Sequence, residues 1–197
     1  FVFVVSLFLF ALAWMEGKGR LIAGVAGMTA LLMIRWAGKT FRPEQAPVVV
    51  TVCLVFCAIY FAVYLIARHW QRASLPVLWA AVGLPFVNLA FALFLMKHHA
   101  VGASPGLLFL FIVASDCFLL TIAWLDDRLQ KLHLVAGLAV FGLLSIWTAG
   151  HLNNALLPWA LAIYLVFAAL HTVFPLLLER KRPAAAPTWW SQLFPPL

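Results

Sequence analysis

The chain of 197 residues is 66% hydrophobic and only 10% charged, with a mean hydropathy of +1.06. Soluble domains are roughly half apolar and a quarter charged, and a water-soluble fold of this length could not bury so much apolar surface, which excludes a soluble globular protein. The net charge of +7 comes from Lys and Arg residues scattered between apolar runs, which argues against a nucleic-acid partner and is typical of the ends of membrane-spanning helices.

Seven apolar segments are long enough, or nearly so, to cross a bilayer, which takes about twenty apolar residues. In chain order they are residues 1–14, 21–36, 47–67, 75–96, 106–125, 132–149 and 155–178. The first resembles the second half of a helix and is predicted to be truncated, and the connectors are too short for a soluble domain. We therefore predict an all-α polytopic transmembrane bundle in which residues 1–197 form a single membrane domain, a section of a longer polytopic protein.

The distribution of Lys and Arg predicts the orientation of these spans. One set of connectors holds nine basic residues and the other holds four; the sets are Lys18, Arg20, Arg68, Arg72, Arg128, Lys131, Arg180, Lys181 and Arg182, against Arg35, Lys39, Arg42 and Lys97. Because cytoplasmic loops carry the excess of basic residues, the first set and the C-terminal end are predicted to be cytoplasmic. The expected partners are the lipid bilayer and other transmembrane helices of the same protein or of a complex.

Asp116 is the strongest candidate for a functional residue. It lies near the middle of the span 106–125. A charge at that depth costs about 3 kcal/mol on insertion scales, so intramembrane acids usually face a cavity or a partner. The neighbours of Asp116 on its own helix are aliphatic, so its partner is predicted to come from another helix or from water.

Depth along the helices selects the candidate partners. At 1.5 Å per residue, Asp116 lies about 15 Å from the cytoplasmic end of its span, His171 and Tyr60 about 12 Å, and Asn88 about 20 Å. These four side chains are predicted to form one intramembrane polar layer, with Asn88 above the others, after a bend at Pro85. The layer serves either helix packing or a proton, ion or substrate pathway, and the sequence does not separate the two.

No motif for a cofactor, a metal or a catalytic centre is present, so none is predicted. The loop histidines His98, His99 and His151 lack the carboxylates that a metal site on that face would need. The remaining histidines, except His171, fall in or beside predicted loops. His171 is therefore predicted to be the only deep one.

The C-terminal third of the chain contains five distinctive runs: Leu132-His133-Leu134-Val135-Ala136-Gly137-Leu138, Leu157-Pro158-Trp159-Ala160, Leu170-His171-Thr172-Val173-Phe174-Pro175, Trp189-Trp190 and Phe194-Pro195-Pro196. The resemblance that they carry is to a family of bacterial predicted membrane proteins known as domain of unknown function 2339. It implies a long polytopic protein of the bacterial inner membrane and supplies no catalytic residues.

Three functions fit these observations. The first is a transport or membrane-complex subunit built around the polar layer of Asp116. The second is a membrane-embedded enzyme acting on lipid-linked or envelope substrates, although the short loops hold few acids or bases. The third is a structural scaffold.

Overall fold

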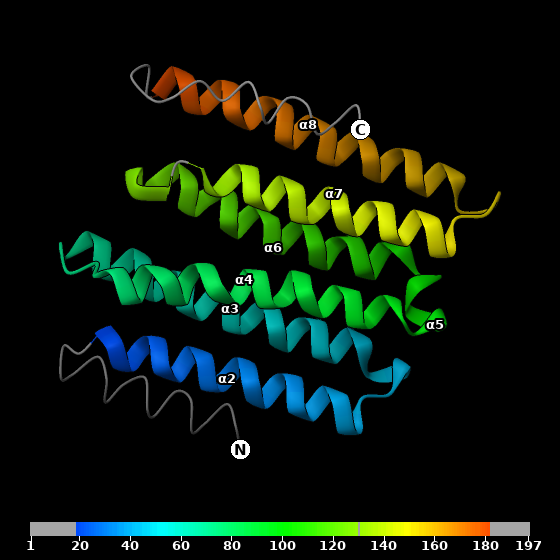
Figure 1. Cartoon of the computed structure of the whole chain (residues 1–197), viewed down its shortest axis with the longest axis horizontal. Helices are drawn as coiled ribbons and strands as arrows, with labels where there is room; N and C mark the ends of the chain where they lie inside the picture. Colours follow the sequence, from blue (N-terminus) through cyan, green and yellow to red (C-terminus); the bar gives the residue numbers. More distant parts are fainter. Residues whose placement is uncertain (1–18, 130, 182–197) are drawn as a thin grey trace. The chain divides into compact units, whose positions relative to one another are not determined.

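The computed structural model describes residues 19–129 and 131–181, which are almost entirely helical (Figure 1). The long helices are α2 (Gly19–Thr40), α3 (Ala46–His69), α4 (Leu75–Met96), α6 (Pro105–Leu125), α7 (Leu132–His151) and α8 (Leu157–Lys181); the short ones are η1 (Pro43–Gln45), α5 (His99–Gly102) and η2 (Asp127–Leu129). The described residues contain no strand, which confirms the all-α prediction. The predicted first span, residues 1–14, lies outside the described residues.

All six long helices are long and apolar enough to cross a membrane, with mean hydropathies from 1.6 to 2.7. The shortest has 20 residues, which at 1.5 Å per residue spans about the 30 Å hydrocarbon core. The protein is therefore a multi-pass membrane protein. The predicted boundaries differ from those of the structure by a few residues, most of all for α2, which runs to Thr40 and not to Trp36. Its basic residues Arg20, Arg35 and Lys39 lie within the helix, toward its ends. Long basic side chains reach water from such positions.

Proline marks the beginnings of several helices. Pro47 lies in the first turn of α3 and Pro105 is the first residue of α6, positions where the missing backbone N–H is not needed. After α3 the chain reverses at Gln71, which has a positive φ of 55°. Helix α4 remains helical on both sides of Pro85. The bend at this proline stays a prediction.

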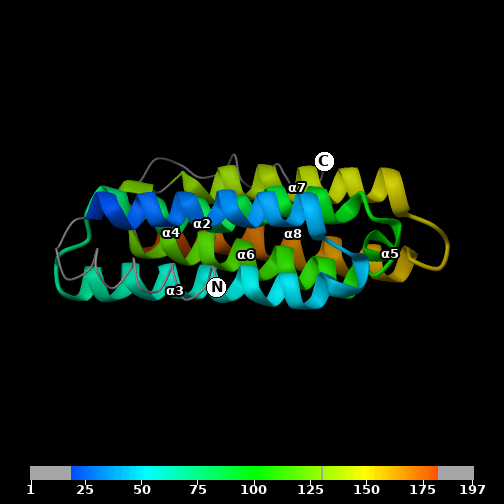
Figure 2. The same ribbon diagram turned by 90° about the horizontal axis from the view of Figure 1, so that it is seen from below.

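The first of two compact units extends to Phe91, and its described part holds α2, α3 and most of α4. Figure 2 shows α2 and α3 running lengthwise in opposite directions, joined at one end through η1. The small side chains Ala26 and Ala30 of α2 are buried, and with Gly83 of α4 they line a narrow cavity of about 260 Å³. Small residues allow membrane helices to approach closely, which explains this face of α2.

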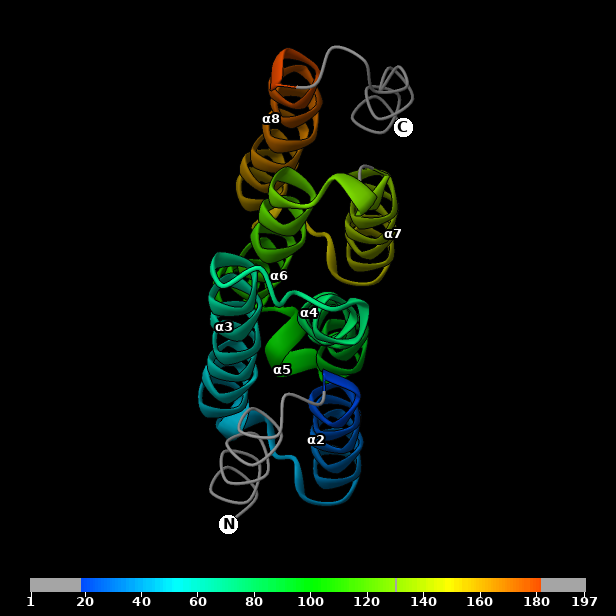
Figure 3. The ribbon, with the colours of Figure 1, turned by 90° about the vertical axis from the view of Figure 1, so that its left-hand side faces the viewer.

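The second unit begins at Ala92 and contains α6, α7 and α8, each of which contacts the other two. Seen nearly end on in Figure 3, these three helices lie at the corners of a triangle. At one end, Lys181 Nζ donates a 2.9 Å hydrogen bond to the Trp124 carbonyl and lies 4.4 Å from the centroid of its ring. Because Trp124 and Lys181 are in the last turns of α6 and α8, these two helices run parallel and α7 runs opposite to them.

Candidate functional site

A buried Asp–His pair joins α6 to α8 within the second unit. His171 Nε2 lies 3.1 Å from Asp116 Oδ2, and the side chains are 1% and 0% exposed. The expectation that Asp116 contacts a polar group of another helix is thus confirmed, and His171, one of the candidates at a similar depth, is that group. Its function stays a prediction.

The sequence places both residues on buried helix faces. In α8 the buried positions recur at intervals of three or four residues, which defines one face toward the other helices; they are Ala160, Ile163, Phe167, His171, Pro175 and Leu178. In α6 the buried positions include Asp116 and its neighbours Ser115 and Ile112 and cover more than one face, because this helix packs against both α7 and α8. An aspartate in the middle of α6 therefore points into protein and not into lipid.

The surroundings of the pair are largely apolar. The Phe141 ring of α7 meets the His171 ring in an edge-to-face arrangement, with centroids 5.7 Å apart. The second carboxylate oxygen, Asp116 Oδ1, is buried and accepts no hydrogen bond from the residues that the structure describes. One oxygen of the carboxyl group is thus engaged by histidine, while the other lacks a protein donor in this part of the chain.

This geometry allows two net-neutral forms of the pair. Either protonated histidine donates to a carboxylate, or a protonated carboxyl group donates to neutral Nε2. Neither form places a net charge among the apolar side chains, whereas gain or loss of one proton does.

A second polar contact fixes the register of α7 against α8. The hydroxyls of Thr148 and Tyr164 lie 3.0 Å apart. On α7, Thr148 is seven positions, or about two turns, after Phe141. On α8, Tyr164 is seven positions before His171, and the rings of Phe141 and His171 are themselves in contact. The two helices therefore run antiparallel, with this face of α8 held against α7 along several turns.

The other two predicted members of the polar layer, Tyr60 and Asn88, belong to the first unit. Both side chains are 3% exposed. Asn88 Nδ2 donates to Cys57 Sγ at 3.1 Å, and the Tyr60 hydroxyl interacts with the Thr29 side chain of α2. These contacts link α3 to α4 and to α2. A common layer with the Asp116–His171 pair stays a prediction.

One buried polar residue, His133, was expected in or beside a loop, at the beginning of the span 132–149. It is the second residue of α7, is 1% exposed, and its ring centroid lies 5.9 Å from that of Phe174 on α8. Phe174 is three residues from His171 and also contacts the Trp124 ring at 6.3 Å. His171 is therefore not the only buried histidine. The spacing of His133 from Gly137 and Val140 was the available signal, since all three share one face of α7.

Asp126 is a further buried acid, with a structural explanation. It follows the last residue of α6, and its carboxylate oxygens accept three hydrogen bonds from Arg128, one of them from the backbone N–H. An acid held by its own loop in this way organises the turn into α7.

Among residues 19–129 and 131–181, no three His, Cys, Asp or Glu side chains are grouped to hold a metal ion.

No protein-family model, no curated protein and no solved structure matches this chain. The resemblance of the C-terminal third to domain of unknown function 2339 therefore stays a prediction. The candidate site rests on the geometry of Asp116 and His171.

Proposed function

We propose that this membrane protein is a transport or membrane-complex subunit in which the Asp116–His171 pair takes up and releases a proton. The supporting observation is the burial of two titratable side chains in contact, midway along spanning helices. A buried ion pair stabilises a fold no better than apolar residues of similar volume, because desolvation offsets the attraction. Packing alone therefore does not account for an acid and a base at this depth, and ionisable residues inside membranes usually serve function.

The chemistry follows from the change in charge. Adding a proton to the neutral pair leaves imidazolium beside a protonated carboxyl group, which weakens their attraction and places a positive charge among apolar side chains. Asp116 belongs to α6 and His171 to α8, so this change alters the force that holds the two helices together. Asp116 Oδ1, without a donor in the described residues, is the carboxyl oxygen that can take the added proton. Coupling of proton uptake to movement of α8 is the step that transport needs.

The proposal is tested by following the His171 ring by NMR in the full chain, labelled at histidine and held in lipid nanodiscs. The signal is assigned by its loss in His171→Gln. We expect the His171 signal to change when the pH is moved between about 5 and 8, and Asp116→Asn to alter that response, because the carboxyl group that contacts Nε2 is gone.

The matched control is Asp127→Asn, which changes an exposed aspartate in η2 and should leave the His171 signal unchanged. A His171 signal that is constant over this pH range in both the wild type and Asp116→Asn would contradict proton exchange. The pair would then act as a packing element and the scaffold function would be favoured.

The proposed setting is the bacterial inner membrane, within a longer polytopic protein, as the resemblance to domain of unknown function 2339 implies. The C-terminal end of α8 is proposed to be cytoplasmic, on the basis of the nine-to-four distribution of Lys and Arg. The contact of Lys181 with Trp124 supports one part of this topology, since it puts the ends of α6 and α8 on the same side.

Cysteine labelling tests this orientation. In a background without Cys53, Cys57 and Cys117, a membrane-impermeant maleimide added to intact cells should label His99→Cys and not Lys131→Cys, because α6 separates the two positions. Permeabilised cells provide the control, in which both positions should react. Labelling of Lys131→Cys alone in intact cells would reverse the proposed orientation.

A further inference from the structure

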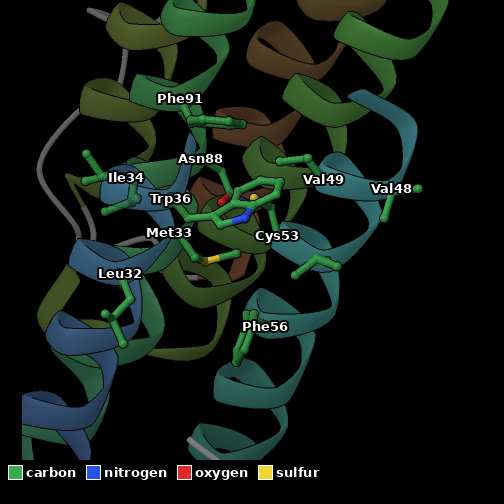
Figure 4. Close-up of a pocket in the computed structure, with 12 residues that line it drawn as sticks. Leu32, Met33, Ile34, Trp36, Val48, Val49, Cys53, Phe56, Asn88 and Phe91 are labelled. Atoms are coloured by element: carbon green, nitrogen blue, oxygen red, sulfur yellow. The ribbon is translucent and has the colours of Figure 1, made fainter. Parts of the chain in front are cut away.

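The first unit contains a larger cavity that the Asp–His pair does not use. It has a volume of about 370 Å³ and lies between α2, α3 and α4 (Figure 4). A volume of this size falls within the range of small-molecule sites. In Figure 4 the Trp36 indole extends from α2 toward Cys53 of α3 and Asn88 of α4, with Phe91 on one side and Phe56 on the other.

The cavity opens toward the surface that the membrane covers. Three residues of its wall are also strongly exposed on the chain: Ile34 of α2 at 53%, Val48 of α3 at 66% and Val52 of α3 at 41%. All three lie within helices that are long and apolar enough to span a membrane. Acyl chains of the bilayer therefore have direct lateral access to it.

The lining favours an apolar occupant. Apart from Asn88, Trp36 and the Cys53 thiol, its side chains are hydrocarbon or thioether, and none is charged. The amide of Asn88 is already engaged, since its Nδ2 donates to Cys57. A polar or charged molecule would lose its hydration in this cavity without gaining hydrogen bonds in return.

Basic side chains lie next to the end of the cavity that Trp36 lines. Lys39 is three residues beyond Trp36, about 4.5 Å further along α2, and Arg42 immediately precedes η1. Both are exposed, and neither forms an ion pair within residues 19–129 and 131–181. They also belong to the minority set of basic residues, on the side where positive charge is not expected. An anion bound there accounts for their position.

We propose that the first unit binds one anionic glycerophospholipid, with an acyl chain in the α2–α3–α4 cavity and its phosphate near Lys39 and Arg42. The cavity runs from Val48 to Phe56, about 12 Å along α3, so it receives the upper part of a chain whose headgroup stays at the membrane surface. The ligand is recognised by the combination of an apolar slot and two cations, which a neutral lipid satisfies only in part. This site is independent of the Asp116–His171 pair, and neither proposal requires the other.

Native mass spectrometry of the full chain in detergent tests the charge preference. The probes are dioleoylphosphatidylglycerol and dioleoylphosphatidylcholine. We expect the anionic lipid to be retained more strongly, and Lys39→Gln and Arg42→Gln to weaken its binding about fivefold each, the usual effect of a basic residue near a membrane surface. Arg72→Gln, at the other end of the unit, is the matched control and should have no effect. Equal retention of the two lipids would overturn the proposal.

A photoactivatable phosphatidylglycerol, with a diazirine on its acyl chain, tests the position of the chain. Adducts are expected on Cys53 and Phe56. Val52→Trp should abolish them by filling the cavity, whereas Val55→Trp, at an equally exposed valine (41% in both cases) that does not line the cavity, should not. Adducts confined to lipid-facing residues such as Leu138 and Leu165 would indicate bulk lipid and overturn the site. Absence of adducts on Cys53 and Phe56 would do the same, and would be the result if residues 1–18 fill the cavity.

Discussion

Replacing His171 with leucine is expected to lower the free energy of unfolding by about 3 kcal/mol, the cost of removing one partner from a buried ion pair. The expected loss exceeds that of an ordinary interhelical hydrogen bond in a membrane, which averages about 0.6 kcal/mol. The reason is that the variant removes the histidine partner of Asp116. Asp116 is fully buried, and the described residues offer it no hydrogen-bond donor other than His171. It must then either remain charged in apolar surroundings or take up a proton.

The double variant Asp116→Leu/His171→Leu separates this penalty from a loss of packing. It removes both polar groups, so we expect it to be more stable than His171→Leu alone and close to the wild type. The measurement is a double-mutant cycle of unfolding in bicelles, completed by Asp116→Leu. If the effects of the two single variants simply add in the double variant, the pair makes no coupled contribution, and the ionised contact would be excluded as a feature of the folded state.

The sequence predicted the helices and the Asp–His contact for related physical reasons. Lipid allows spanning helices to be apolar all round, so their extent is visible in the hydropathy alone, and all six described spans were located. Asp116 and His171 stood out because polar residues are costly at that depth, and the depth estimate placed His171 among three candidate partners of Asp116. Helix α2 was underestimated because its terminal basic residues were counted as connector and not as helix.

The features that were missed depend on contacts between helices. His133 is buried because Phe174 of α8 packs against its ring, and nothing in the sequence of α7 reveals that neighbour. The same holds for Asn88, whose partner proved to be Cys57 of α3, 31 positions away. The number of residues between a position and the end of its span gives its depth along the membrane normal. It does not give the rotation of each helix or the order of helices in the bundle, and these decide which groups meet.

The position of His133 adds to the interpretation of the second unit. Phe174 contacts His133 and Trp124, and it lies one turn from His171 toward the end of α8. These aromatic rings therefore stand between the buried pair and the Asp126–Arg128 turn.

Replacing Trp147 with alanine is expected to lower the free energy of unfolding by about 3 to 5 kcal/mol, the usual range for removing a large buried aromatic side chain. Trp147 is fully buried in α7, and its ring meets Phe109 of α6 edge to face at 5.0 Å. Its Nε1–H also donates a 2.8 Å hydrogen bond to the Gly102 carbonyl, which fixes α5 against α7. A Cβ at Gly102 would overlap the His151 ring, so a larger residue there requires that ring to move.

Two further variants separate the parts of this effect in thermal and chemical unfolding of the full chain. Trp147→Phe keeps most of the packing but leaves the Gly102 carbonyl without its donor, so a smaller loss of about 1 to 2 kcal/mol is expected. Trp159→Ala removes an equally large side chain that is 53% exposed on α8, and it should change the stability by no more than about 0.5 kcal/mol.

Trp147 lies six residues along α7 from Phe141, about 9 Å from the level of the Asp–His contact. Trp147→Phe should therefore leave the pH response of the His171 signal as in the wild type, while Asp116→Asn alters it. The same change in both variants would mean that the response follows general loosening of the bundle and not the Asp–His contact.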